Sequence, residues 1–533
     1  MRPVDRRTFL LATLAASGAL GLSACGGGGR SSRSGPVGDP RPGGSLVVQM
    51  TSEISTSIHP LLQTDPAAMG VISGTVYSKL LEFRTGADVD TLEIVPDLAE
   101  SWEISPDGLT YTFRLRDDVR WQNVPPVNGR PFTSDDVVAT FEAVKRTPAQ
   151  YAWMFEPVTS ITAPDEHTAV FTLERPYAPL LEYLAYHFNM VVPREGIEGR
   201  YDLETQAIGT GPFLLDSHTP DVEWVLKRNP DYFVPGRPYL DEIRRPILSD
   251  TAAITAALRS GRLDAGVTSD VNVADEFRSR GGFTVTETPG APISIYLNPR
   301  VKPLDDVRVR QAVMEAVDWV GMGENIRGHF NLTSLLRPDT SPAALTRDEV
   351  LRLRPFDPAH ARALLAEAGL PNGFSTSLLV QRVDDEDVRE AQWMQADLAE
   401  VGINAEIEIV DPATGIDRRR NHDFAITKAL RGVHLPDQVW RDFEPDSIEN
   451  YALVDDPELN RMVDESRATV DDAARNEIYR QMQVRMESQI RQAFYPIQKY
   501  DYAIANERVQ DLWPSPIYQG RRLADVWLAD SEA

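Results

Sequence analysis

The residues that most often carry metal or nucleophilic chemistry are sparse in this chain of 533 residues. It contains eight histidines and one cysteine, and the histidines lack the short spacings of a zinc site or of a nickel site made by protein ligands alone. The hydrolase signatures Gly-x-Ser-x-Gly and His-Glu-x-x-His are also missing. We therefore expect no metal, no cofactor and no catalytic residue, and we keep a secreted hydrolase with a spatially assembled triad as one alternative.

Four consecutive acids, Asp384-Asp385-Glu386-Asp387, form the densest candidate for a cation site. A calcium loop alternates its ligands and needs a glycine for its sharp turn, and the run has neither feature. Acids also favour the first turn of a helix, where they interact with the positive end of its dipole. We interpret the run as the solvated start of a helix over residues 386–401.

Several side chains could instead recognise a ligand without covalent chemistry. Tyr296, Trp393 and Trp440 offer aromatic faces on which a ligand could stack, although such residues more often belong to a core. His59 precedes Pro60, so it either faces a cleft or ends a loop.

The N-terminal residues read as an export signal over residues 1–24. Arg6-Arg7-Thr8-Phe9-Leu10 is followed by a short apolar run, which is typical of a signal peptide and resembles a twin-arginine signal, although Asp5 replaces the usual small hydroxyl residue. Leu22-Ser23-Ala24-Cys25 resembles a lipobox, in which Cys25 would carry lipid. The alternative is an ordinary signal peptide with an incidental cysteine.

Residues 25–44 then form a lipidated cysteine and a flexible tether, because this stretch is rich in Gly, Ser and Pro and has few apolar residues to bury. Acyl chains contribute about 0.8 kcal/mol per buried CH₂. We therefore expect the protein on the extracytoplasmic face of the membrane, held by lipid.

Charge and length limit the classes of protein that fit. The formal net charge of -26 argues against nucleic-acid binding, which needs basic surfaces. A chain of 533 residues is too long for one core and predicts two to four domains. The 39 prolines and 34 glycines suit a loop-rich α/β fold better than a helical bundle.

The best-defined local structure lies between Pro96 and Val144. Residues 100–104 and 109–115 alternate apolar and polar side chains around Ser105-Pro106-Asp107-Gly108, which predicts a β-hairpin. Thr133-Ser134-Asp135-Asp136 then predicts the start of a helix. A small unit with both strands and a helix results.

Further patterns predict elements on both sides of this unit. We expect a helix over residues 67–83, a tight turn at Gly209-Thr210-Gly211-Pro212, and long amphipathic helices over residues 457–469 and 473–490. The half before residue 300 is rich in strands, and the half after it contains βα units.

Motifs in the right order give the chain a family resemblance. Pro96-Asp-Leu-Ala-Glu-Ser-Trp, Pro106-Asp-Gly-Leu-Thr-Tyr-Thr-Phe, Arg228-Asn-Pro-Asp-Tyr-Phe and Asp305-Asp-Val-Arg-Val-Arg-Gln-Ala-Val resemble extracellular solute-binding proteins of family 5, the peptide, oligopeptide and nickel receptors of ABC importers. The resemblance covers nearly all of residues 45–510.

The resemblance implies an α/β fold of the periplasmic-binding-protein type II, with two lobes, a hinge and an additional small α+β domain. Lobe I would comprise residues 45–80, 206–293 and 496–533, the additional middle domain residues 81–205, and lobe II residues 294–495. The hinge crossings would lie near Ser294 to Asn298 and at Tyr495-Pro496.

The resemblance also implies a mechanism and partners. A monomeric receptor would capture a peptide or another small solute, such as a sugar or an opine-like compound, by hinge closure and deliver it to an ABC permease and ATPase complex. A lipoprotein that senses a ligand without transport would share the same fold.

Strand edges at residues 51–55 and 429–435 are the implied binding segments. Peptide-binding relatives carry in the second segment an aspartate that pairs with the ligand's α-amino group, and here His434 takes that place if Pro436-Asp437 is the matching pair. Arg431 nearby would favour an anionic or uncharged ligand. The expected ligand-binding residues are Glu53, Ser55, His59, Tyr296, Trp393, Leu430, Arg431, His434 and Trp440.

Overall fold

The computed structural model describes residues 38–54, 57–62, 66–86, 92–146, 151–430, 432, 435–513 and 523–529. The predicted export signal and Cys25 lie outside these residues. Within the described ranges, no helix combines the length and the apolar composition that crossing a bilayer would require.

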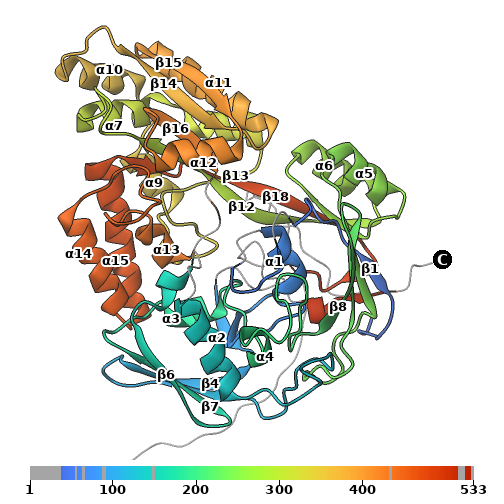
Figure 1. Cartoon of the computed structure of the whole chain (residues 1–533). Helices are drawn as coiled ribbons and strands as arrows, with labels where there is room; N and C mark the ends of the chain where they lie inside the picture. The colour runs from blue at the N-terminus through green and yellow to red at the C-terminus, as the bar shows by residue number, and fades with distance from the viewer. Residues whose placement is uncertain are drawn as a thin grey trace, which may run out of the picture. The chain divides into compact units, whose positions relative to one another are not determined.

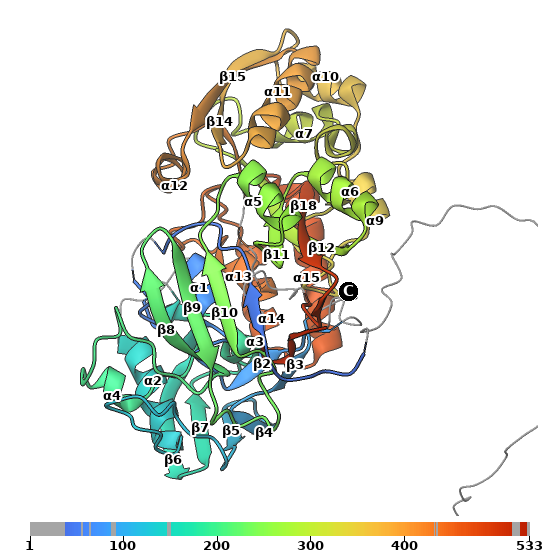
Figure 2. The ribbon, with the colours of Figure 1, turned by 90° about the vertical axis from the view of Figure 1, so that its right-hand side faces the viewer.

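The first sheet has four strands in the order β1-β10-β9-β8, seen side by side in Figure 2. Strands β1 and β10 are parallel, and the remaining pairs are antiparallel. The strands are β1 (Ser45–Val47), β8 (Phe213–Thr219), β9 (Glu223–Arg228) and β10 (Glu242–Pro246), and the neighbouring elements are α1 (Pro66–Ile72), α5 (Thr251–Arg259), β11 (Ala265–Thr268), α6 (Val271–Arg280), β19 (Val509–Gln510), the 3₁₀ turn η4 (Leu523–Asp525) and β20 (Trp527–Leu528).

A second, antiparallel sheet in the order β4-β5-β7-β6 lies within residues 99–173. The predicted hairpin is confirmed, since β4 pairs with β5 and Gly108 supplies a positive φ of 71° in the turn. Around it lie β2 (Leu81–Phe83), β3 (Ile94–Pro96), β4 (Ala99–Ile104), β5 (Thr110–Leu115), α2 (Ser134–Arg146), the 3₁₀ turn η1 (Ala152–Phe155), β6 (Val158–Asp165), β7 (Thr168–Leu173), α3 (Leu180–Ala185) and α4 (Arg194–Ile197).

Asp136 explains why the first turn of α2 forms where the sequence predicts it. This carboxylate is fully buried and accepts hydrogen bonds from the Trp121 indole at 3.0 Å and from the Arg130 guanidinium at 2.6 and 2.8 Å. It also accepts from the backbone amides of Thr133 and Arg194. A buried carboxylate is stable only with such partners, so this acid ties the helix start to its surroundings.

The third sheet has eight strands, with the main order β11-β18-β12-β16-β14-β15. Its strands beyond β11 are β12 (Phe283–Leu297), β13 (Phe330–Leu332), β14 (Phe374–Gln381), β15 (Ile403–Val410), β16 (Ile426–Leu430), β17 (Ala493–Phe494) and β18 (Ile497–Asn506). The helices of this part are α7 (Val307–Ala316), α8 (Trp319–Met322), the π-helix η2 (Gly323–Arg327), α9 (Arg347–Leu353), α10 (Pro358–Glu367), α11 (Asp385–Glu400), α12 (Pro412–Arg420), α13 (Pro436–Arg441), α14 (Pro457–Ala468), α15 (Asp472–Arg485) and the π-helix η3 (Met486–Ile490).

Strand β12 is the longest of the described strands and changes partners along its length. Residues 283–289 pair with β18, whereas residues 293–297 pair with β16, and the register shifts between Pro289 and Pro292. Strand β18 likewise follows β17 after Tyr495 and Pro496, and β17 pairs with β12. One sheet is therefore continuous from β11 to the parallel strands β14, β15 and β16.

Two local predictions are wrong for steric reasons. The helix expected over residues 67–83 ends at Ile72, because Gly74 adopts a positive φ of 72° and Ser73 forms a bridge with Tyr77. The expected tight turn at Gly209 is a backbone contact, since a Cβ atom there would lie 1.9 Å from the carbonyl oxygen of Val76. The glycine serves a close approach between two backbones.

Buried apolar residues form one large cluster around the first two sheets, two clusters in the part that contains β14 to β16, and a small cluster under α5 and α6. Leu435 is fully buried and belongs to the first, large cluster although its neighbours in the chain belong to the other part. Each of the first two sheets falls within one predicted domain, and the domain boundaries themselves stay a prediction.

Candidate functional site

The carboxyl ends of parallel strands are where open α/β sheets bind their ligands. Strand β1 is parallel to β10 and leads through a bridge between Val48 and Ala265 to β11, the neighbour of β18. Strand β16 is parallel to β14 and antiparallel to β12. The segment after β16 thus leaves from a strand next to β12, and the segment after β1 leaves from a strand that β11 connects to β18. These are the two segments expected to bind a ligand.

In its described residues only the second segment presents part of the strand edge that we expected, since Ala429 and Leu430 have no strand partner on the side of β14. Ala429 and Leu430 pair with Ser294 and Ile293 of β12, and the hydroxyl of Ser294 donates to the Ala429 carbonyl at 3.2 Å. On the other side, pairing with β14 stops at Lys428. Residues 51–54 form no strand at all.

Glu53 uses its carboxylate to fasten its own loop. It accepts hydrogen bonds from the backbone amide of Asp221 at 2.7 Å, from the Trp224 indole at 3.1 Å and, at 3.0 Å, shares one with the His218 ring. His218 stacks on Trp224 with 3.6 Å between ring centroids. Partial burial raises the pKa of Glu53, but the hydrogen bonds outweigh it and lower the pKa to about 2. The carboxylate therefore stays ionised and ties the loop after β1 to β8 and β9.

His59 ends the loop that precedes the turn at residues 60–62, which is one of the two roles expected for it. Its Nδ1 accepts from the backbone amide of Leu61 at 3.2 Å, so the neutral ring carries its proton on Nε2. Burial lowers the pKa of this half-buried imidazole, against the opposing effect of Glu204 and Asp202. The ring is thus neutral at pH 7.

Two of the three aromatic candidates lie in a core. Tyr296 is 2% exposed and contacts Tyr451 edge to face at 5.5 Å between centroids. Trp440 is fully buried and stacks on Tyr479 at 6.5 Å. Both belong to the same buried cluster, so their faces serve packing, and the stacking role expected for them is wrong.

The other described candidates are partly buried. Trp393 lies on α11 and Leu430 ends β16, and both pack against the core under β14. Ser55, Arg431, His434 and the expected lipid anchor Cys25 lie outside the described residues, so their roles stay predictions.

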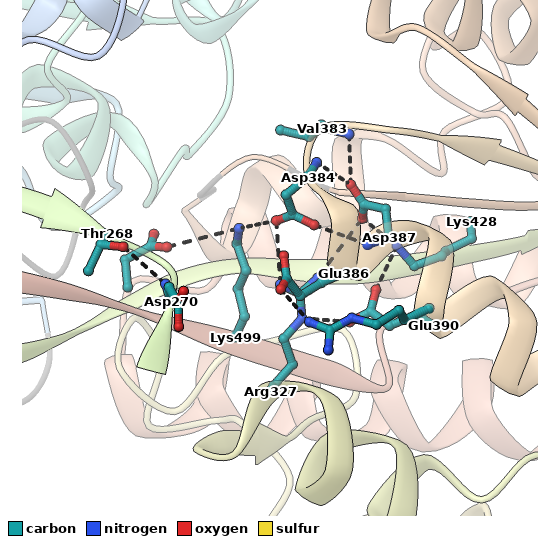
Figure 3. A network of polar contacts seen from close by, with 12 residues as sticks. Thr268, Asp270, Arg327, Val383, Asp384, Glu386, Asp387, Glu390, Lys428 and Lys499 are labelled. Atoms are coloured by element: carbon teal, nitrogen blue, oxygen red, sulfur yellow. Dashed lines mark hydrogen bonds and ion pairs between the residues drawn. The ribbon is translucent and has the colours of Figure 1, made fainter. Parts of the chain in front are cut away.

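The sequence did not reveal a buried network of charged residues at the carboxyl ends of β14 and β16. Lys428 is fully buried and lies 2.5 Å from Asp387 and 2.7 Å from Glu390 (Figure 3). Arg327 of η2 contacts Glu390 at 2.6 Å, and Asp384 lies 3.5 Å from Lys499 of β18. The network joins α11 and β16 to the long strand β18.

Electrostatic interactions keep Lys428 and Asp384 of this network ionised. Burial lowers the pKa of Lys428, but Glu390 and Asp387 outweigh it and raise the pKa. Burial raises the pKa of Asp384, but Arg327 and Lys499 lower it to about 2. The helix start expected at the acid run is confirmed, because Asp384 caps α11. Asp387 is however fully buried, so the run is not uniformly solvated. The one indication of this network in the sequence was a lysine among otherwise uncharged residues of a predicted strand.

One hollow of about 450 Å³ lies on the first part of the molecule. Ile54, Ser57, Gln122, Leu214 and His218 are among its walls, and none of the described lining residues comes from β16 or from the helices that follow it. It therefore adjoins the loop fastened by Glu53. Backbone groups, hydroxyls and the imidazole around it could bind a small polar molecule.

Comparison with known proteins identifies relatives across most of the chain. The family model described as "Bacterial extracellular solute-binding proteins, family 5 Middle" matches residues 93–441. The dipeptide-binding protein of Escherichia coli (strain K12) is 29% identical over 466 residues, which are 81% of this chain and 85% of the relative. Heme-binding protein A of Haemophilus influenzae is 29% identical over 386 residues, 67% of this chain and 69% of that protein.

The structure of HbpA2 from Haemophilus parasuis is similar over 91% of this chain and 100% of that chain, with a TM-score of 0.78 and 26% identity. The expected α/β fold with two lobes is confirmed by this similarity.

Proposed function

Because the chain belongs to the bacterial extracellular solute-binding proteins of family 5, we propose that it is the substrate-binding receptor of an ABC importer. It captures a small solute between lobes I and II and delivers the solute to a membrane permease. The family is one of receptors, so the protein's work is binding and a change of shape, without a covalent step.

Strands β12 and β18 run through both parts of the molecule, and this observation carries the proposal. Residues 283–289 of β12 pair with β18, and residues 293–297 pair with β16. A few residues at such a crossing can absorb the rotation of one lobe against the other. Ligand that contacts both lobes stabilises the closed form by its differential affinity for that form.

We assign the hinge to the register shift between Pro289 and Pro292 on β12 and to Tyr495 and Pro496 before β18. The first crossing then lies a few residues before Ser294 to Asn298, where the family resemblance implied it. The proposed division into lobe I, middle domain and lobe II is otherwise kept. The two binding segments, which follow β1 and β16, then lie one on each lobe.

A short peptide is the first ligand class to test. The dipeptide-binding relative supports it, and the heme-binding relative shows that the family also serves other ligands. Peptide-binding relatives are expected to carry an aspartate where this chain has His434, and Arg431 nearby favours an anionic or uncharged solute over a free ammonium group. A charge-assisted hydrogen bond to an ammonium is worth about 1.5–3 kcal/mol, so its loss would cost one to two decades of affinity.

We also propose that the protein is exported and held on the membrane by lipid on Cys25, as a monomer. The sequence Leu22-Ser23-Ala24-Cys25 supports the lipid, and the family supports a location outside the cytoplasm. Metabolic labelling with a fatty acid should label the wild-type chain and leave a Cys25→Ala variant unlabelled.

Native mass spectrometry of the purified protein tests the receptor function directly. We expect a small solute to co-purify with it, and re-addition of that solute to protein refolded without it should reduce the radius of gyration in X-ray scattering. A scattering curve that does not change with this solute, or with a panel of peptides, sugars and opines, contradicts closure by ligand.

The role of His434 has its own test. His434→Asp should shift preference within the same panel toward ligands with a free amino group, because the new carboxylate can pair with it. His422→Asp, a substitution in the loop before β16, is the matched control and should leave the preference unchanged. Equal affinities of wild-type and His434→Asp protein for every panel member remove His434 from the site.

A further inference from the structure

Helix α13 and the residue before it pack into two different hydrophobic cores. Leu435, which precedes the helix, is fully buried in the large cluster around the first two sheets. Trp440, one turn later, is fully buried in the cluster under α14 and α15. In Figure 1 the helix accordingly lies between α3 of the middle domain and α14 and α15 of the second lobe. Six residues thus connect the packing of two parts of the molecule.

Asp437 forms polar contacts between the same two parts of the molecule. Its carboxylate is fully buried, accepts a hydrogen bond from the hydroxyl of Tyr183 on α3, and lies 2.7 Å from Nε of Arg467 on α14. Arg467 also contacts Glu444. Burial, followed by the negative charge of Asp437, raises the pKa of Tyr183, so the hydroxyl keeps its proton and donates it.

Other contacts surround this pair on the same face. The backbone amide of Ala178, just before α3, donates to the carbonyl of Arg467 at 2.8 Å. The Arg441 guanidinium lies 5.8 Å from the ring centroid of Trp153. A buried ion pair is costly to desolvate and is stable only when its geometry and hydrogen bonds are complete, so the Asp437–Arg467 pair favours one position of α3 against α13.

The place of α13 in the chain makes the contact relevant to binding. It follows β16, whose end Leu430 pairs with β12 near the proposed hinge. The covalent links between the proposed lobes run through β12 and through the residues before β18. The contact of α3 with α13 and α14 is therefore a noncovalent link at a different place from the hinge.

From these contacts we propose that the present arrangement is the closed form, and that Tyr183 and Asp437 form a clasp that holds lobe II against the middle domain in this form without ligand. The proposal rests on the proposed hinge closure. It gives the middle domain a part in binding, since the apparent dissociation constant is the intrinsic constant divided by the fraction of protein in the binding-competent form. A clasp that favours closure sets that fraction.

The clasp can be tested in ligand-free protein. Spin labels on Glu166→Cys, in the turn between β6 and β7, and on Ala363→Cys, on α10, report the distance between middle domain and lobe II by pulsed electron resonance. Both positions are exposed, and Cys25→Ser removes the native cysteine. We expect a population at the distance of the present structure, and Tyr183→Phe should lower its ratio to longer distances about tenfold, as expected for a lost hydrogen bond to a charged group.

Tyr111→Phe is the matched control. Its hydroxyl is also buried and donates to the Tyr177 carbonyl at 3.1 Å, but both residues belong to the middle domain. The control should leave the distances unchanged. Equal distributions for wild type and Tyr183→Phe overturn the clasp, as does an equal shift in Tyr111→Phe. Wild-type protein with only long distances also overturns it and leaves the proposed function intact, because ligand could still close the lobes.

Discussion

The charged groups of Glu53 and Lys428 form hydrogen bonds and ion pairs within the protein, so they stabilise its folded structure. Glu53 fastens the loop after β1 through four donors: the Ile54 and Asp221 amides, Trp224 and His218. Lys428 neutralises two carboxylates that have almost no exposure to solvent. In both cases the partners stabilise the segment from which a ligand contact would be made, so the effect on binding is indirect.

Removal of the Glu53 charge should destabilise the protein in a way that depends on pH. The pKa of Glu53 is about 2 in the folded protein, below its ordinary value of 4.5. Its stabilisation is therefore fully present above pH 4.5 and is lost as the pH falls through about 2. We expect Glu53→Gln to lower the free energy of unfolding by about 1–2 kcal/mol at pH 7.

Urea denaturation at pH 7 and at pH 3 measures this effect, and the difference between wild type and Glu53→Gln should shrink at the lower pH. Glu198→Gln, which removes a carboxylate from an exposed ion pair, should change stability little at either pH. A constant difference across this range contradicts the role of the ionised carboxylate.

Lys428→Met should destabilise the protein far more, because it removes the nearest cation of buried Asp387 and leaves Glu390 with Arg327 alone. Breaking a buried ion pair costs about 3–5 kcal/mol. Lys227→Met is the matched control, since Lys227 also lies on a strand but pairs with Asp216 at 3.1 Å with 53% of its side chain exposed. The control should cost less than about 1 kcal/mol. Similar unfolding midpoints for the two variants would show that the buried network adds no stability.

At the scale of elements, steric contacts decide where helices and strands end. Helix α1 stops at Ile72 because the following residues turn back, and the backbone of Gly209 packs against the turn at Val76. Gly211 takes part in the same contact, since a Cβ atom there would lie 2.4 Å from the carbonyl oxygen of Thr75.

Gly209→Ala tests this contact. The new methyl carbon would lie 1.9 Å from the Val76 carbonyl oxygen, so the backbone must move and the free energy of unfolding should fall by more than about 2 kcal/mol. Gly199→Ala is the control, since Gly199 has a positive φ of 73° with nothing near the added carbon. This substitution should lower the free energy of unfolding by only about 1–2 kcal/mol, the cost of placing a residue with a Cβ atom in the left-handed conformation. Thermal unfolding compares the two, and equal costs would rule out the steric reason.

At the scale of the whole molecule, the interface between the middle domain and lobe II carries a second titratable group. Glu182 of α3 lies beside Arg475 and Asp472 of α15 and Asp437 of α13. Its Oε2 is buried and has no hydrogen-bond partner. Burial raises its pKa to about 7, against the attraction of Arg475. The interface thus holds a carboxyl group that loses its proton near neutral pH.

The stability of the protein should fall as the pH rises through this range, because Glu182 holds its proton more tightly in the folded state. The folded pKa lies above the ordinary value of 4.5, so the stabilisation is fully present below pH 4.5 and is lost as the pH rises through about 7. The Glu182→Gln variant has no carboxyl group to ionise, so its free energy of unfolding should not fall in this way. We expect the variant to be more stable than wild type by about 1–2 kcal/mol at pH 8 and equally stable at pH 4.5.

Urea denaturation across this range checks the prediction, with Glu174→Gln, an exposed position before α3, as the control without effect. A wild-type stability that rises between pH 5 and pH 8 relative to Glu182→Gln would show that ionised Glu182 is the favoured form.

The sequence by itself determined the family, the hairpin at Gly108, the start of α2 and the cap of α11 at Asp384. These features depend on residues close together in the chain, where alternation, turn residues and capping side chains act over a few positions. The motif order along the chain was enough to predict the fold with two lobes, which similarity to a solved structure confirms.

Only the tertiary structure decided which of these side chains are free to meet a ligand. Glu53 lies 165 positions from His218, and Tyr183 lies 254 positions from Asp437, so no local pattern could indicate either contact. Tyr296 and Trp440 have the aromatic faces of a binding site, yet they are buried in a core. The physical reason is that burial and ion pairing depend on which distant segments pack together, and sequence patterns of a few residues do not encode that choice.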